Sequence, residues 1–252
     1  MVSRDAGKDL RRFKNVVSDL KLPHSSGGIG EAKGEKTAMR GYSLRSGLPI
    51  LAILLLAGAA RAESTGETLR FAVMRDGQQI GSTTIELHRN GVETTVQVAT
   101  HIQVKLAFVT VYRFDQTETE HWRDGQLVAL ASATDDNGTK HRVKATSGNN
   151  KITVTADGKV TEVAGTTIPA SYWNPALLGK TTALDPQDGA IVPVAVVDRG
   201  EDHLIVQGRA KRTHHYVIRT TFPQDVWYDE DRQLVKVQLK GSDGSTISYQ
   251  PG

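Results

Sequence analysis

Apolar and polar side chains alternate along most of the chain after residue 63. Between Val92 and Val104, valine, threonine and isoleucine occupy every second position, and polar side chains such as Glu93 and Gln97 occupy most positions between them. Neighbouring side chains of a β-strand point to opposite faces, so this pattern is typical of a sheet with one buried face. The same pattern predicts strands near 69–73 and at 112–122, 127–134, 141–145, 152–156, 191–197, 203–206, 214–219, 234–239 and 246–249.

Turn-forming dipeptides separate these strands at short intervals. Each pair is Asp or Asn followed by Gly, and these residues tolerate the positive φ angles of tight hairpin turns. Because strand-length segments lie between the pairs, the chain is predicted to fold as an antiparallel meander. The pairs are Asp76-Gly77, Asn90-Gly91, Asp124-Gly125, Asn137-Gly138, Asp157-Gly158, Asp188-Gly189 and Asp243-Gly244.

One segment, TIPASYWNPALLGKTTALDP at residues 167–186, breaks this pattern. Its internal prolines exclude a continuous ladder of strand hydrogen bonds. A short helix that begins at Pro175 is predicted instead. Either Ser171 or Asn174 would cap this helix, and residues 176–178 would form its inner side.

The number of strands indicates how the sheet is shaped. A strongly twisted sheet of nine or more strands tends to curl, and the apolar irregular segment would then lie across the curl. The predicted fold is mainly β, a single antiparallel meander that forms an open or partly closed β-barrel with one short helical or irregular segment. A two-sheet β-sandwich is the alternative.

The most apolar run of the chain has the parts of a secretory signal. In GLPILAILLLAGAARAES, residues 47–64, the small residues Ala60 and Ala62 frame a cleavage site, so that Glu63 would begin the mature protein. A buried helix and a membrane-spanning helix are alternatives, but a span needs about 20 apolar residues, and this run is shorter. The chain is therefore predicted to consist of an extension at 1–38, a signal peptide at 39–62 and a single β-rich domain at 63–252.

Removal of the leader changes the charge of the protein. Residues 1–38 are basic, rich in glycine and poor in apolar periodicity, so we expect them to be disordered or not part of the native protein. Residues 1–62 hold 11 of the 31 Lys and Arg and 5 of the 28 Asp and Glu, which leaves 20 basic and 23 acidic residues and a net charge of −3. We therefore expect no nucleic-acid partner.

The chain contains no cysteine. Disulfides therefore cannot stabilise an exported domain of this sequence, and a hydrophobic core must do so. Bacterial lipoproteins carry a cysteine directly after the cleavage site, where Glu63 stands in this chain. We expect a soluble periplasmic protein without a stable membrane span in its mature form.

Three blocks of the sequence resemble a known family. The resemblance is carried by VTVYRFDQTETEHWRDGQLVALASATDDNG at 109–138, SYWNPALL at 171–178 and DVWYDEDRQLVKVQL at 225–239. These blocks are similar to an uncharacterised family of bacterial exported proteins known only as a domain of unknown function. The resemblance implies an envelope location and a β-rich fold, and it suggests distant kinship to half-barrel periplasmic lipoprotein carriers. It brings no catalytic residues with it.

Established catalytic motifs are absent from the sequence. It has no serine elbow, no zinc-protease motif, no phosphate-binding loop and no dinucleotide fingerprint, and thiol catalysis is excluded because cysteine is absent. His101 and His121 lie on separate predicted strands. They would form a hydrolase site only if they met a carboxylate such as Glu118 or Glu120 in a cleft.

The sequence predicts no metal site and no cofactor. His214 and His215 are neighbours in a predicted strand, so their side chains point to opposite faces and cannot bind one ion together. The acidic clusters at 135–138 and 229–231 lie in predicted turns and lack the spacing of a helix-loop-helix calcium site.

Aromatic side chains form the one pattern that indicates binding. If the sheet curls, Tyr112, Phe114, Trp173 and either Trp227 or Tyr228 would line a concave apolar surface. Packing in the core is the alternative interpretation. We expect a binding module for an apolar small molecule or lipid. A structural or interaction domain in cell-envelope assembly and, ranked last, a hydrolase with an unfamiliar site are the alternatives.

Overall fold

The computed structural model of the protein describes residues 64–106, 108–241 and 243–252. The predicted extension at 1–38, the predicted signal peptide at 39–62 and the expected first mature residue, Glu63, lie outside the described residues. Among the residues that are described, no helix is long and apolar enough to cross a membrane.

The described residues form strands and one 3-10 helix. The first eight strands are β1 (Thr65–Arg75), β2 (Gln78–Asn90), β3 (Glu93–Leu106), β4 (Val109–Arg123), β5 (Gln126–Asp136), β6 (Thr139–Gly148), β7 (Lys151–Ala156) and β8 (Lys159–Ala164). The helix η2 (Pro175–Gly179), β9 (Thr182–Leu184) and β10 (Ile191–Pro193) follow. The last strands are β11 (Ala195–Val206), β12 (Arg209–Arg219), β13 (Pro223–Asp229), β14 (Leu234–Lys240) and β15 (Thr246–Pro251).

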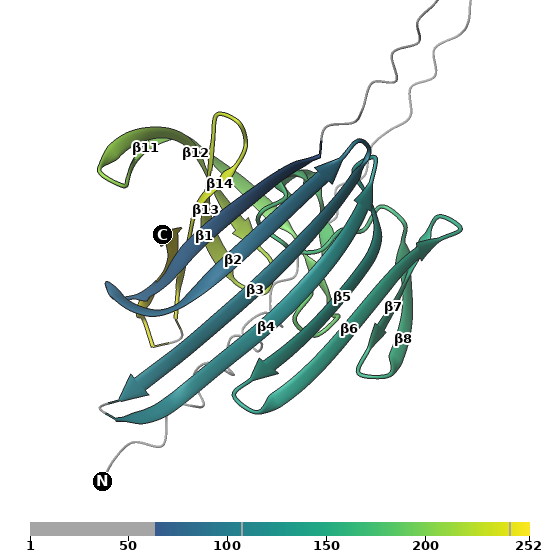
Figure 1. Ribbon diagram of the computed structural model, residues 1–252, viewed down its shortest axis with the longest axis horizontal. Coiled ribbons are helices and arrows are strands. Elements are labelled where there is room, and N and C mark those ends of the chain that lie inside the picture. Colours follow the sequence, from purple (N-terminus) through teal and green to yellow (C-terminus); the bar gives the residue numbers. More distant parts are fainter. Residues whose placement is uncertain (1–63, 107, 242) are drawn as a thin grey trace, which may run out of the picture. The chain divides into compact units, whose positions relative to one another are not determined.

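Thirteen of these strands form one antiparallel sheet (Figure 1). Their order is β11-β12-β13-β14-β15-β1-β2-β3-β4-β5-β6-β7-β8. Neighbours in the sheet are neighbours in sequence except at one point, where the last strand, β15, pairs with the first, β1. The sheet is open, with β8 and β11 as its edges. The predicted mainly β, open antiparallel meander is therefore confirmed.

Residues 165–194 connect the two edges of this sheet and are called the crossing segment below. They contain η2 and a separate two-stranded sheet of β9 and β10. Hydrogen bonds join the segment to strands that lie far apart in the sheet. Ser171 donates to Glu120 on β4, and Ser132 on β5 donates to the carbonyl of Pro186. At the other side, Tyr228 on β13 donates to the carbonyl of Tyr172. The sheet therefore bends around this segment.

The predicted short helix is present in the crossing segment. Asn174 caps it, with its side chain accepting a hydrogen bond from the Ala176 N–H at 3.0 Å, and Pro175 occupies its first turn. Of the residues predicted to form its inner side, Leu177 is fully buried, Leu178 packs on the core and Ala176 is exposed. The helix is of the tighter 3-10 type, so a different set of side chains faces inward than in an α-helix.

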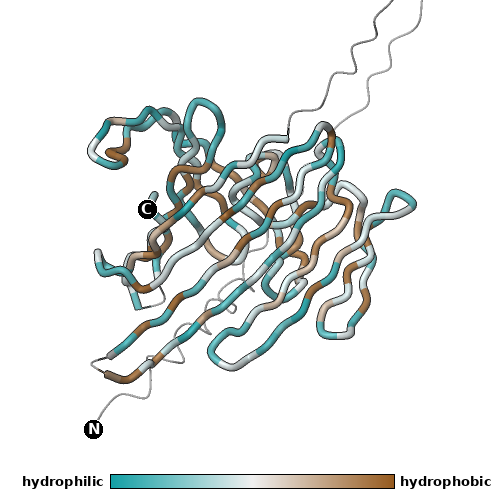
Figure 2. The backbone as a smooth tube through the Cα atoms, in the orientation of Figure 1, coloured by the Kyte–Doolittle hydropathy of each residue, from teal (hydrophilic) through white to brown (hydrophobic). Residues whose placement is uncertain are grey.

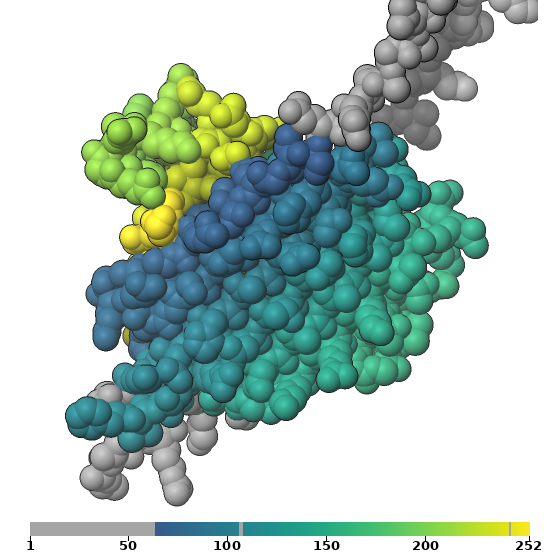
Figure 3. All heavy atoms as spheres, in the orientation of Figure 1, coloured from purple at the N-terminus to yellow at the C-terminus, as the bar shows by residue number. Residues whose placement is uncertain are grey.

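One hydrophobic core holds the sheet and the crossing segment together. Side chains from β1 to β7 and from β12 to β14 pack against Ile168, Leu177, Leu184 and Val192 of the segment. The strands alternate between apolar and polar positions along their length (Figure 2). In the space-filling view, β1 to β6 lie side by side as a continuous surface (Figure 3). The face of the sheet that meets the crossing segment is called the inner face below.

Four of the seven predicted turn pairs adopt the expected tight-turn conformation, whereas at 90–91, 188–189 and 243–244 only the glycine has positive φ. At 76–77, 124–125, 137–138 and 157–158, both central residues have positive φ, which matches the twist of paired strands. Two further turns of this kind, at 149–150 and 207–208, have Asn-Asn and Gln-Gly at their centres and carry no Asp-Gly or Asn-Gly signature.

Candidate functional site

Strand β4 places a row of side chains on the inner face of the sheet. Alternate residues from Tyr112 to Trp122 point inward, and the row changes from aromatic to acidic and back to aromatic. Its first part lines a cavity, and its second part lies buried under the crossing segment. The row consists of Tyr112, Phe114, Gln116, Glu118, Glu120 and Trp122.

The cavity has a volume of about 730 Å³. It lies between the inner face of the sheet and the crossing segment, and strands from both halves of the meander contribute to its wall. About half of the wall residues, 14 of 29, are apolar or aromatic. These apolar residues are Ile80, Ile102, Val104, Tyr112, Phe114, Ala170, Tyr172, Pro186, Ala190, Val192, Phe222, Leu239, Ile247 and Tyr249.

Three tyrosines of the wall remain uncharged well into the alkaline range. Burial raises the pKa of Tyr249 to about 12. Burial, together with the negative charge of Asp136, also raises the pKa of Tyr112, whose hydroxyl donates to Asp136 at 2.9 Å. Burial raises the pKa of Tyr172 as well, against the opposing effect of a hydrogen bond with Thr220. These hydroxyl groups are therefore fixed hydrogen-bonding groups on an apolar wall.

Gln224 is a buried polar residue of the wall whose amide oxygen has no partner. Its exposed fraction is 6%, and Oε1 accepts no hydrogen bond from any described residue. The hydroxyl oxygen of buried Thr134, opposite Gln116 in the sheet, is likewise without a partner in the described part of the chain. Buried polar atoms are nearly always hydrogen-bonded, so these two unpaired oxygens are unusual features of the interior beside the cavity.

Cations on the cavity wall are paired with carboxylates. The guanidinium of Arg75 forms an ion pair with Asp243, which also belongs to the wall. The imidazole of His141 lies 2.7 Å from a carboxylate oxygen of Asp157. The wall also contains three other carboxylates, those of Asp136, Asp185 and Asp188.

Glu118 and Glu120 form a buried pair of carboxyl groups next to the cavity-lining part of β4. Glu120 has an exposed fraction of 0%. Its Oε1 accepts hydrogen bonds from Ser171 Oγ at 2.7 Å and Trp173 Nε1 at 3.3 Å, and its Oε2 accepts one from Trp122 Nε1 at 2.7 Å. The two indole rings meet edge to face with centroids 5.8 Å apart. Ser171 Oγ also lies 3.3 Å from Oε1 of Glu118, so the crossing segment contacts both carboxyl groups and binds Glu120 more closely.

Burial raises the pKa of Glu118 well above its ordinary value. The negative charge of Glu120 and a hydrogen bond between the two carboxyl groups raise it further, and the hydroxyl of Ser171 acts in the opposite direction. Two carboxyl groups this close cannot both ionise in a dry interior. Glu118 is therefore the group that retains a proton. The pair is sealed by the two tryptophans, and it serves to fasten the crossing segment to β4.

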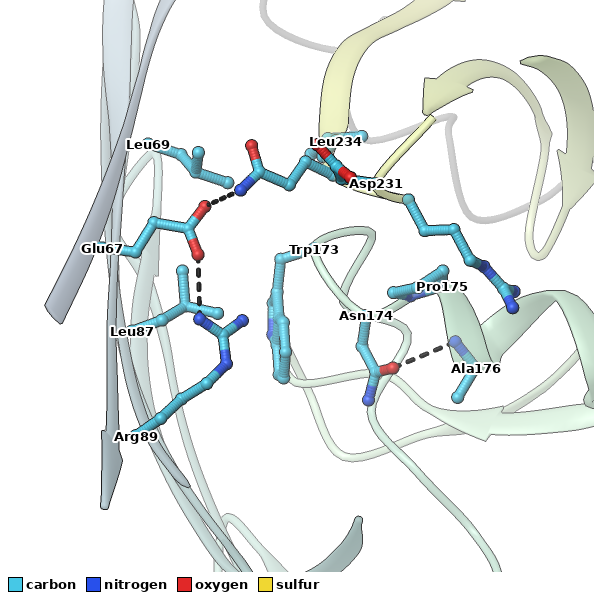
Figure 4. A pocket seen from close by; sticks show the side chains of 12 residues that line it. Glu67, Leu69, Leu87, Arg89, Trp173, Asn174, Pro175, Ala176, Asp231 and Leu234 are labelled. Carbon is cyan, nitrogen blue, oxygen red and sulfur yellow. Dashed lines mark hydrogen bonds and ion pairs between the residues drawn. The ribbon is translucent and has the colours of Figure 1, made fainter. Parts of the chain in front are cut away.

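A second, smaller pocket lies where β1 and β2 face the start of η2 (Figure 4). Its volume is about 430 Å³. Trp173 forms one wall, and Glu67 on the other side accepts hydrogen bonds from Arg89 at 2.9 Å and from Gln233 at 2.6 Å. These polar groups satisfy one another across the pocket.

The aromatic residues singled out in the sequence do not all meet at one place. Tyr112 and Phe114 lie together in the wall of the large cavity, and Trp173 lies in the second pocket. Trp227 belongs to the outer face, where its ring stacks on His215 at 4.4 Å and its Nε1 donates to Asp202. Its neighbour Tyr228 points into the core. Whether any of these residues binds a ligand stays a prediction.

The histidines considered as acid-base groups lie away from the buried carboxyl pair. His101 and His121 are exposed, and their partners are Asp115 and Thr95. Because Glu118 points to the inner face, the strand geometry separates it from both histidines. Among the residues that the structure describes, no cluster of His, Asp or Glu is arranged to hold a metal ion.

Comparison with known proteins identifies relatives of this chain. The family described as Domain of unknown function (DUF6134) matches residues 71–252. Among solved structures, the crystal structure of a β-barrel-like protein of domain of unknown function DUF1849 from Brucella abortus matches with a TM-score of 0.56. The two chains are 13% identical, and the match covers 76% of this chain and 97% of the other, so the similarity concerns the fold alone. No curated protein matches.

Proposed function

We propose that this chain, which belongs to the family described as a domain of unknown function (DUF6134), binds an apolar or lipid-like molecule in the cavity behind the crossing segment. The observation that carries the proposal is the cavity itself. Its volume of about 730 Å³ falls within the range of small-molecule sites, about 300–1,000 Å³. Apolar and aromatic side chains make up about half of its wall and are combined with polar and charged groups, and such polar groups orient a ligand in a binding site.

Ligand extraction tests this proposal directly. The protein would be purified from its host without detergent, extracted with organic solvent and analysed by mass spectrometry. We expect an apolar molecule in stoichiometric amount. An empty extract, together with failure to bind a fluorescent apolar probe, would contradict the proposal.

A pair of tryptophan variants locates the binding. Ala190→Trp introduces an indole at an exposed position that lines the cavity, so it should displace the probe, whereas the control position lies outside the cavity wall. Ala131→Trp places the same indole at an exposed position of β5 and serves as the control. Equal probe affinity in both variants would place the ligand elsewhere.

The proposed site of action is the periplasm, after cleavage behind Ala62. Support comes from the small residues at 60 and 62 and the apolar run that precedes them. The protein from the periplasmic fraction should begin at Glu63. Recovery of a chain that begins at Met1 in the cytosol would overturn this location.

A structural or interaction domain of the cell envelope is the second candidate. Its support is the tip of the hairpin between β3 and β4, where Phe108 is 102% exposed and Val109 is 65% exposed. This tip extends beyond the neighbouring strands (Figure 1) and is hydrophobic (Figure 2). These two exposed apolar side chains are the feature that we propose as a contact site. A photo-crosslinking amino acid at Phe108 should capture an envelope partner that the same group at exposed Val160 does not. No capture at either position would remove this candidate.

A further inference from the structure

We propose that the ligand of the large cavity is a cationic amphiphile, an apolar chain that ends in a protonated amine, and that the cavity selects against anions such as fatty acids. This inference rests on the proposed function, because it names the chemistry of the molecule that the cavity holds. It comes from the charges and hydrogen-bonding groups of the wall.

The ionisable groups of the wall are predominantly acidic. Four carboxylates stand against one guanidinium and one imidazole. They are Asp136, Asp185, Asp188, Asp243, Arg75 and His141. Charges that face a cavity with low-dielectric walls act more strongly on a ligand than they would in open water. A cationic headgroup is therefore attracted, and an anionic one is repelled.

The cationic groups of the wall are already engaged. Arg75 is paired with Asp243, and His141 is paired with Asp157. An anionic headgroup would have to compete with these carboxylates for its partners. The wall carboxylates have hydrogen-bond partners as well, but a carboxylate can accept several hydrogen bonds at once, so a cationic headgroup adds to these contacts rather than replacing them.

The buried amide of Gln224 is an independent observation that points the same way. Its Oε1 is an acceptor without a donor among the described residues, on a side chain that is 6% exposed and belongs to the cavity wall. After a rotation of the amide side chain that turns this oxygen toward the cavity, the N–H donors of an ammonium group would satisfy it, and a carboxylate carries no such donor. The unpaired acceptor of Gln224 and the acidic wall thus both favour a headgroup that is positively charged and carries hydrogen-bond donors.

Three probes with the same alkyl chain test the inference on the full-length mature protein. Decylamine, decanol and decanoate differ in headgroup charge, and each would compete with a fluorescent apolar probe at pH 7 and low ionic strength. We expect the amine to bind about tenfold more tightly than the alcohol, and the carboxylate more weakly than both. Equal or tighter binding of decanoate would overturn the inference and leave the proposed function intact. Failure of all three, and of the apolar probe, would contradict the proposed function itself.

A charge-removing variant completes the test. Asp136→Asn keeps an oxygen that can accept from the Tyr112 hydroxyl but removes a negative charge from the wall. It should weaken amine binding several-fold and strengthen decanoate binding. Glu162→Gln removes an exposed carboxylate on β8, where it pairs with Lys151, and should change neither. Identical headgroup preferences in the two variants would show that the wall charge does not select the ligand.

Discussion

The hydroxyl of Ser171 lies 2.7 Å from Oε1 of Glu120, and this hydrogen bond joins the crossing segment to strand β4 in the interior of the sheet. Both residues are buried, so neither can exchange its partner for water without opening the interior. The segment that covers the cavity is thus fixed at a point outside the cavity wall. The stability of the cover and the chemistry of the cavity can therefore be changed separately.

Replacement of Ser171 by alanine should destabilise the protein by about 1–3 kcal/mol, because the variant leaves a buried carboxyl oxygen with one donor fewer. Urea unfolding followed by circular dichroism measures the change in the free energy of unfolding. Ser147→Ala, at an exposed position of β6, is the matched control and should have little effect. Equal stability of the two variants would show that the Ser171 hydroxyl does not fasten the segment.

Glu118 should make the stability of the protein fall as pH rises. Its pKa in the folded protein is raised, chiefly by burial, above the ordinary value of about 4.3. At pH values between the pKa in the unfolded state and the pKa in the folded state, the folded protein binds more protons than the unfolded protein. The contribution of Glu118 to stability is therefore fully present below the unfolded-state pKa and is lost as pH rises to the folded-state pKa. The slope is about 1.4 kcal/mol per pH unit within that window.

Glu118→Gln tests this pH dependence. Glutamine keeps an N–H donor for Glu120 but does not titrate, so the variant should lose the slope that Glu118 causes. Urea unfolding at a series of pH values from 5 to 9 should show the variant gaining stability relative to the unmodified protein as pH increases. Two parallel stability curves would mean that Glu118 titrates alike in the folded and unfolded states.

Local patterns predicted most of the sheet. Alternation in β3 placed Val96 and Thr100 on the buried face, where they lie, and Asp-Gly or Asn-Gly pairs predicted turns such as those at 76–77 and 124–125. The turn at 149–150 was missed because asparagine replaces glycine at its second central position. Asparagine tolerates positive φ there as well, so the conformation is the same without the usual signature.

Long-range contacts were beyond such patterns. Nothing in the residues of β1 and β15 specifies that these terminal strands pair, because each is compatible with several neighbours. The alternation around Trp227 fits two phases, and only the packing of Tyr228 in the core shows that Trp227 faces outward. The burial of Glu118 was also missed, although it occupies the same strand face as Tyr112 and Trp122. A glutamate in a strand is normally expected to face solvent. The residues that make burial possible here lie on the crossing segment, far away in sequence, so the strand alone gives no sign of them.

The close contact between Gly81 on β2 and the backbone of β3 gives a further prediction. A Cβ atom at Gly81 on β2 would lie 2.1 Å from the carbonyl oxygen of His101 and 2.8 Å from Cα of Ile102, both on β3. These are backbone atoms held by a strand ladder, so the clash cannot be relieved by a side-chain rotation. Ile102 also lines the large cavity, so the displacement would reach its wall.

Gly81→Ala should therefore destabilise the protein by about 3 kcal/mol and weaken binding of the apolar probe. Gly148→Ala is the matched control, because a Cβ atom at Gly148 meets no atom within 4 Å. Thermal unfolding and probe titration on both variants measure the two effects. Equal stability of Gly81→Ala and Gly148→Ala would contradict the prediction. It would mean that β2 and β3 can move apart at Gly81 and Ile102 without a measurable loss of stability.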